Sequence, residues 1–258
     1  MSDVDFQCTK CGECCRGFRL PLSVEEAICW LRDGNSVDVL CQAIPWIDEP
    51  PASDLAGAYQ RGRSFSAMSG AMPIRVIVTL AAPLGNRCPN LSADNRCNIY
   101  ERRPGTCRTY PAELNPLLQL MPQHRRCPPE AWQPGGAPLI RNGAYVDLEL
   151  GSLIRGKLKQ PALDAPILAE LCRKLGVDVA AMANEGYVAY SPSNAELLGA
   201  LATERPSHVA AVQSDWTFIS DKLDTVEAIL SCDANCVRAG DFVRTGFVYL
   251  SHFDKATT

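Results

Sequence analysis

Four cysteines near the start of the chain constrain this sequence more than any other feature. They are spaced as Cys8-x2-Cys11-x2-Cys14-Cys15. Two residues between cysteines form a tight turn that brings both sulfurs to one metal at about 2.3 Å, and Gly12 permits the backbone to turn there. Because this spacing does nothing for a hydrophobic core, it predicts a metal site. Adjacent side chains usually point apart, so Cys14 and Cys15 suit two metals, or one metal and a spare thiol.

Four more cysteines follow downstream, each at an expected turn or beside a proline or an arginine. Proline follows directly after Cys88 and Cys127, and the same Cys-Pro pairing ends the ligand run of bacterial ferredoxins. The sequence therefore offers eight candidate metal ligands: Cys8, Cys11, Cys14, Cys15, Cys88, Cys97, Cys107 and Cys127. The other cysteines are interpreted differently: Cys29 and Cys172 as core residues, Cys41 as isolated, and Cys232 and Cys236 as structural.

Composition predicts a folded protein in a reducing compartment. The chain has 258 residues, of which 47% are hydrophobic. It begins with an acidic segment that does not resemble a signal peptide, and no apolar run reaches the roughly 18 residues that a membrane span needs. We therefore expect a cytoplasmic protein. There, clustered cysteines more often bind metal or carry redox chemistry than form structural disulfides.

Charge is distributed unevenly along the chain. The net charge is −4, yet residues 61–126 hold ten arginines, no lysine and three acidic residues, which leaves +7 in this segment and −11 elsewhere. A basic segment can indicate nucleic-acid binding. Here the arginines alternate with cysteines, and metal-bound thiolates retain negative charge. We interpret most of them as compensating a metal centre, with Arg103 and Arg108, which flank Cys107, as the residues expected to contact it.

Local patterns predict an α+β fold with two consecutive domains. Ser23 and Glu26 form a capping box that begins a helix ending near Gly34. A β-branched run predicts a strand over Ile74–Ala82. Two further short strands are expected at 88–91 and 96–100, and 44–73 is expected to be a long irregular segment.

The glycine- and proline-rich segment 133–138 is interpreted as the domain boundary. Residues 1–135 are then a loop-rich cysteine-cluster domain with short strands, and residues 136–258 are a mainly helical domain. Helices are expected at 147–159, 165–175, 177–184, 193–203 and 222–231. Short strands are expected at 187–190, 216–220 and 242–251.

The combined motifs resemble a known family. After Cys8-x2-Cys11-Gly12-x-Cys14-Cys15, the chain carries Cys88-Pro89-x-Leu91 and then Arg96-Cys97-x-Ile99-Tyr100-x2-Arg103-Pro104-x2-Cys107-Arg108-x-Tyr110-Pro111. This pattern, spread over roughly residues 6–130, resembles the YkgJ-type CxxCxxCC family of zinc- or iron-chelating proteins and, more distantly, the flagellin lysine N-methylases. The resemblance implies that Cys88, Cys97 and Cys107 are metal ligands together with the N-terminal group.

Iron and zinc both accept four thiolates, so ligand type does not separate them. Compact structural zinc sites usually pair two Cys-x2-Cys units, whereas one extended loop with distant single cysteines is closer to cluster ligation. We therefore expect an iron–sulfur cluster, with a redox or methyl-transfer-related role.

The alternative is a non-catalytic structural-zinc module that binds a partner protein. In either case we expect neither a membrane nor a nucleic acid as the partner. The sequence shows no Gly-rich nucleotide loop, nucleophile elbow or His-Glu-x-x-His motif. It assigns no catalytic residue and does not decide whether the protein is an enzyme.

Overall fold

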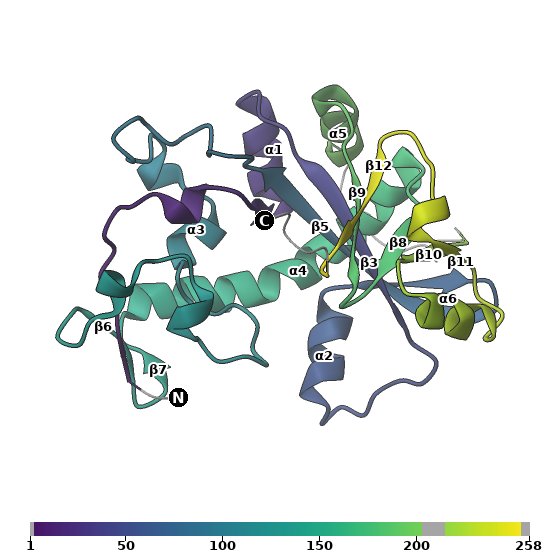
Figure 1. The fold of residues 1–258 in the computed structure, drawn as a ribbon, viewed down its shortest axis with the longest axis horizontal. Coiled ribbons are helices and arrows are strands. Elements are labelled where there is room, and N and C mark those ends of the chain that lie inside the picture. Colours follow the sequence, from purple (N-terminus) through teal and green to yellow (C-terminus); the bar gives the residue numbers. More distant parts are fainter. Residues whose placement is uncertain (1–2, 203–214, 254–258) are drawn as a thin grey trace. The chain divides into compact units, whose positions relative to one another are not determined.

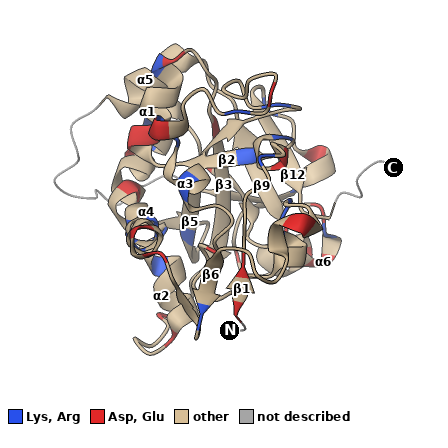
Figure 2. Ribbon diagram, turned by 90° about the vertical axis from the view of Figure 1, so that its left-hand side faces the viewer, with Lys and Arg blue, Asp and Glu red and all other residues tan. Residues whose placement is uncertain are grey.

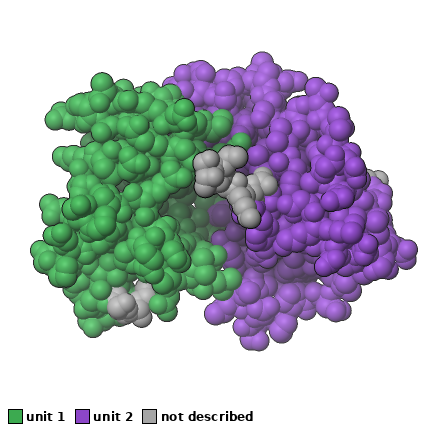
Figure 3. All heavy atoms as spheres, viewed as in Figure 1, with its two compact units in different colours: residues 1–22, 83–160 green, residues 23–82, 161–258 purple. Residues whose placement is uncertain are grey.

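The computed structural model describes residues 3–202 and 215–253 of the chain. The chain divides into two compact units, coloured separately in Figure 3: unit 1 comprises residues 1–22 and 83–160, and unit 2 comprises residues 23–82 and 161–258. These units differ from the two consecutive domains predicted from composition. The glycine- and proline-rich segment near residue 135 is a loop inside unit 1, because the strands that follow it and the next helix up to residue 160 belong to the same unit as the N-terminal residues.

Unit 1 consists largely of loops and short elements (Figure 1). Its strands are β1 (Val4–Asp5), β2 (Arg19–Leu22), β6 (Pro138–Arg141) and β7 (Ala144–Tyr145). Its helical turns are η1 (Glu13–Cys15), η2 (Tyr100–Arg102), α3 (Gly105–Thr109), η3 (Pro122–His124) and η4 (Pro129–Trp132). Strands β1, β6 and β7 form an antiparallel sheet in that order. A small core covers this sheet, formed by buried Leu120, Leu139 and Ile140 with Phe6 and Trp132 packed against them.

Unit 2 is built on a mixed sheet with the strand order β11-β10-β8-β3-β5. These strands are β3 (Asp38–Pro45), β5 (Met72–Pro83), β8 (Val179–Met182), β10 (Thr217–Ser220) and β11 (Cys236–Arg238). Strand β10 is parallel to β8 and β11, β8 is parallel to β3, and β3 is antiparallel to β5. Three more strands join them: β4 (Phe65–Ser69) pairs with β5, and β9 (Gly186–Tyr190) pairs with both β3 and β12 (Phe247–Ser251).

The helices follow capping and apolar patterns in the sequence. They are α1 (Val24–Arg32), α2 (Leu55–Gly62), α4 (Leu148–Leu175), α5 (Asn194–Leu201) and α6 (Leu223–Leu230). The predicted capping box of α1 is confirmed: the amide of Glu26 donates to Ser23 Oγ at 3.2 Å, and the amide of Ser23 donates to the Glu26 carboxylate at 2.8 Å. Among the described residues, no helix has the length and apolarity to cross a membrane.

The α+β class is confirmed, and several expected elements need correction. The helix predicted at 177–184 is strand β8 with the turn after it, because its small apolar residues are buried inside the sheet. The two helices predicted at 147–159 and 165–175 are the single helix α4, which contains Pro161 and Pro166. The two short strands predicted around Cys88 and Cys97 are reduced to one isolated bridge between Leu91 and Cys97.

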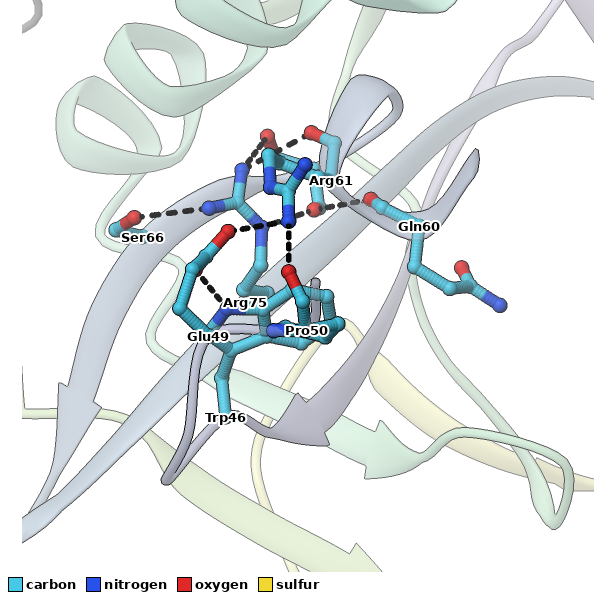
Figure 4. Close-up of polar contacts among 8 residues, drawn as sticks. Trp46, Glu49, Pro50, Gln60, Arg61, Ser66 and Arg75 are labelled. Atoms are coloured by element: carbon cyan, nitrogen blue, oxygen red, sulfur yellow. Dashed lines mark hydrogen bonds and ion pairs between the residues drawn. The ribbon is translucent and has the colours of Figure 1, made fainter. Parts of the chain in front are cut away.

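The segment 44–73, predicted to be irregular, contains α2 and β4. Arg75 in β5 holds this segment in place (Figure 4). Its guanidinium donates to Ser64 Oγ at 2.7 Å, to Ser66 Oγ at 3.1 Å and to the carbonyl of Arg61 at 3.0 Å. The sequence did not predict α2 and β4 because the hydrogen bonds of Arg75, rather than a regular spacing of apolar residues, hold this segment.

Three arginines of the basic segment are therefore structural residues of unit 2. Besides Arg75, Arg61 forms an ion pair with Glu49 and donates to the carbonyl of Pro50. Arg63 donates to Tyr59 Oη at 2.9 Å. In Figure 2, basic residues occur on many elements with acidic residues among them. The interpretation that most of the ten arginines compensate a metal centre consequently does not apply to these three.

Candidate metal centre

The N-terminal cysteine loop is shaped by a tight turn at Gly12. Gly12 has a φ of +79°, and the amide of Cys15 donates to its carbonyl at 2.9 Å, closing the turn η1. A Cβ at this position would lie 3.1 Å from Asn95 Oδ1. That same oxygen accepts a hydrogen bond from Arg16 Nη2 at 3.0 Å. The loop needs glycine here both for its backbone conformation and for the close approach of Asn95.

The two adjacent thiols Cys14 and Cys15 are in contact, with their sulfurs 3.9 Å apart. The hydrogen bond between them raises the pKa of Cys14 and lowers that of Cys15, and the charges of Arg103 and Arg16 lower the pKa of Cys15 further. Cys15 is thus the member of the pair that is more readily a thiolate, the form that binds metal.

Hydrogen bonds of the backbone attach the segment around Cys88 to Cys15. The amide of Cys88 donates to the carbonyl of Cys15 at 2.8 Å. The amide of Gly17 donates to the carbonyl of Gly85 at 2.6 Å, directly before this segment. The Cys88 thiol also has a hydrogen bond from the backbone of Asn90, which opposes the increase in its pKa that burial causes. An N–H group directed at sulfur stabilises a bound thiolate.

Helix α3 adds Cys107 to this group. Its neighbour Thr106 donates through Oγ1 to the carbonyl of Pro21 at 2.9 Å, which fixes α3 beside β2. Burial raises the pKa of the Cys107 thiol to about 12, and the nearby Cys15, Cys88 and Cys97 raise it in the same direction.

Cys127 is held against the N-terminal loop from a different direction. The guanidinium of Arg126 donates to the carbonyl of Arg16 and, at 3.1 Å, to the carbonyl of Gly17. The amide of Arg126 donates to Tyr110 Oη at 3.0 Å, and this hydroxyl lies 3.7 Å from the sulfur of Cys127. Burial raises the pKa of Cys127, and the nearby charges of Cys11 and Cys8 add to the increase.

The chemistry of this donor set fits a thiolate-bound metal centre. All thirteen cysteines lie in the described residues as free thiols, and the eight candidates all belong to unit 1. Two buried N–H groups beside them, Arg16 Nε and Asn90 Nδ2, have no hydrogen-bond partner. In the described ranges, no three Cys, His, Asp or Glu side chains already converge on a single point as metal ligands would.

Comparison with protein families agrees with this geometry. Residues 7–128 match the family model CxxCxxCC, whose description is "Putative zinc- or iron-chelating domain". Over this stretch the chain is similar to the CxxCxxCC family, and we refer to residues 7–128 as the CxxCxxCC domain. No curated protein and no solved structure matches the chain. The match begins before the first cysteine loop and ends after Cys127, so it encloses all eight candidate ligands as well as the insertion 23–82.

Arg103 and Arg108 were expected to contact a metal centre in this CxxCxxCC domain, and the structure gives the two arginines different neighbours. Arg103 lies close enough to help lower the pKa of Cys15 and to oppose the increase in the pKa of Cys107, and its guanidinium covers the ring of Tyr100 at 3.7 Å. Arg108 instead pairs with Glu149 at 3.3 Å. Its expected role at a metal centre stays a prediction.

Two residues of the CxxCxxCC domain that the sequence analysis did not select lie beside candidate ligands. Arg16 lies near Cys15 and follows it directly in the sequence. Tyr110 lies beside Cys127 and belongs to the Tyr110-Pro111 part of the family pattern.

Three cysteines of unit 2 lie outside the candidate centre. Cys29 was expected to be buried but is exposed on α1, whereas buried Cys172 is confirmed as a core residue. Cys172 in α4 is hydrogen-bonded to buried Cys41 in β3, a pairing that no sequence spacing indicated.

Proposed function

We propose that the CxxCxxCC domain binds iron as an iron–sulfur cluster and that the protein has a redox or methyl-transfer-related role in the cytoplasm. One observation supports iron most strongly: Arg126, directly before Cys127, donates hydrogen bonds to the carbonyls of Arg16 and Gly17 at the end of the N-terminal cysteine loop. Three cysteines from a Cys-x2-Cys-x2-Cys loop and one remote Cys-Pro form the ligand pattern of bacterial ferredoxin clusters.

Surroundings of the thiols also suit a cluster. Hydrogen bonds to sulfur and nearby positive charge tune the reduction potential of iron–sulfur centres. Tyr110 Oη lies by Cys127, and Arg103 lies by Cys15 and Cys107. The cluster, when bound, would supply one-electron chemistry. The protein residues would hold it, donate hydrogen bonds to its sulfurs and limit its contact with water.

A structural-zinc module that binds a partner protein is the second candidate. It is favoured by the small apolar core of unit 1, which centres on Leu120, Leu139 and Ile140. A domain with few buried apolar residues often depends on metal for its folding. In that case the thiols replace a core, and the protein is not an enzyme.

Metal content after anaerobic purification tests the choice between iron and zinc. Cells supplied with iron should yield a brown protein with broad absorption in the visible range, containing iron and acid-labile sulfide in equal amounts. An aliquot exposed to air and chelator is the control, and its colour should be lost. A colourless protein with stoichiometric zinc from the same anaerobic preparation would replace the redox proposal with the zinc module.

A further inference from the structure

We infer that the eight cysteines form two separate four-thiolate centres, with Cys14 in one and Cys15 in the other. We call them centre A, formed by Cys8, Cys11, Cys14 and Cys127, and centre B, formed by Cys15, Cys88, Cys97 and Cys107. The inference rests on the proposed function only in that these thiols bind metal, and it holds for iron or zinc.

Two groups of hydrogen bonds attach downstream segments to the N-terminal loop. The guanidinium of Arg126 donates to the carbonyls of Arg16 and Gly17, directly after the two vicinal cysteines, and brings Cys127 to the loop. The amide of Cys88 donates to the carbonyl of Cys15, and the amide of Gly17 donates to the carbonyl of Gly85, so that the segment of centre B lies beside Cys15. The N-terminal loop is therefore joined by two downstream segments, each of which supplies its own cysteines.

The segment of centre B is internally connected. The bridge between Leu91 and Cys97 and the hydrogen bond from the amide of Asn98 to the carbonyl of Asn90, at 2.8 Å, hold Cys97 beside Cys88. Cys107 joins them through α3, which Thr106 attaches to β2. Together with Cys15 these supply four thiols, the number that one tetrahedral metal or one cubane cluster requires.

Electrostatic neighbours fall into the same two groups. The thiols that affect the pKa of Cys107 are Cys15, Cys88 and Cys97. Those that affect Cys127 are Cys11 and Cys8, and those that affect Cys14 include Cys127 and Cys8. Among these described neighbours, the two groups meet at the contact between Cys14 and Cys15, whose sulfurs lie 3.9 Å apart, as expected of adjacent side chains that serve neighbouring centres.

Each centre also has its own positive charge. Arg103 and Arg16 lie near Cys15, in centre B, whereas Arg125, which forms an ion pair with Glu113 at 2.7 Å, lies near Cys127, in centre A. A metal with four thiolates keeps excess negative charge whether it is zinc or a four-iron cluster, so each of two centres would need a cation beside it.

Single and double substitutions in the full chain distinguish two centres from one. After anaerobic reconstitution, Cys11→Ser and Cys107→Ser should each lower the metal content to about half, since serine is a poor substitute for a thiolate ligand. The double variant Cys11→Ser/Cys127→Ser, within centre A, should remain near half. The double variant Cys11→Ser/Cys107→Ser, across the centres, should lose nearly all metal. Cys29→Ser and Cys232→Ser, at exposed cysteines, should leave it unchanged.

A single centre with spare thiols predicts a different result. Substitution of any true ligand would then abolish all metal binding, and substitution of a spare thiol would leave metal binding unchanged. That pattern would overturn the inference. Because a variant could fail to fold, cadmium NMR of the unaltered chain is a second measurement. Cadmium binds thiolates as zinc does, so two centres should give two cadmium resonances, and one resonance would contradict the inference. Two centres that contain zinc rather than iron would contradict only the iron–sulfur proposal.

Discussion

At the residue scale, the two proposed centres meet at the contact between Cys14 and Cys15, whose sulfurs lie 3.9 Å apart. The spacing of Cys8, Cys11, Cys14 and Cys15 has no use in a core, so it stands out in any fold. The division between Cys14 and Cys15 depends on backbone hydrogen bonds such as that between Cys88 and Cys15, which lie 73 positions apart. Such long-range contacts leave no periodic trace in the sequence.

Gly12 offers a test of the loop geometry at this scale. Gly12→Ala must place an L-residue at a φ of +79° and push its Cβ against Asn95 Oδ1, which is 3.1 Å away. We expect a loss of metal content together with a loss of stability of about 1 kcal/mol or more. Gly34→Ala is the matched control, because Gly34 has a φ of +84° with open space around it.

Both variants carry the same type of backbone strain, so the stability of both should fall in urea titrations. Metal content, measured by elemental analysis, should fall only in Gly12→Ala. Equal metal retention in the two variants would show that the turn at Gly12 does not position the cysteines.

At the element scale, predictions succeeded where local signals are strong. The capping box of α1, the strand β5 and the strands β9, β10 and β12 were all expected close to where they lie. Failures came where tertiary contacts decide. Strand β8 has the composition of a helix but is buried between β10 and β3, and α2 and β4 depend on the hydrogen bonds of Arg75.

The capping box of α1 can be tested by Ser23→Ala. This change removes the acceptor for the amide of Glu26 and should lower the free energy of unfolding by about 1 kcal/mol. Ser193→Ala removes the equivalent box at α5, where Glu196 is the partner, and should cost about the same. Denaturant unfolding followed by circular dichroism would measure both. Metal content should be unaffected, since both helices belong to unit 2, and a lower metal content in Ser23→Ala would contradict this division.

At the scale of the whole molecule, the chain builds its metal-binding unit from two separated stretches. Residues 23–82 leave unit 1 after β2, form much of the unit 2 sheet, and return through β5. The sequence indicated a long excursion but not its destination, because pairing of β3 with the distant strands β8 and β9 is non-local. Unit 2 has its own buried core, including Trp216, Phe218 and Ile219, whereas unit 1 has few buried apolar residues.

Metal removal should therefore unfold one unit before the other. Structural metal sites contribute on the order of 10 kcal/mol to folding, so anaerobic chelation should open unit 1 while unit 2 keeps its core. Trypsin should then cleave first after Arg96 and Arg108, in unit 1. Arg75, in strand β5 between β3 and β4 and bonded to Ser64 and Ser66, should stay protected.

Protection of residues 23–82 is the decisive part of this prediction, because they lie between the two groups of cysteines in the sequence. If the metal-binding domain were a continuous stretch over residues 1–135, Arg75 would become cleavable together with Arg108. Mass spectrometry of the fragments over time, with the metal-loaded protein as control, separates the two cases. Simultaneous cleavage at both arginines after chelation would mean that unit 2 has no stability of its own, and that metal organises the whole chain rather than unit 1 alone.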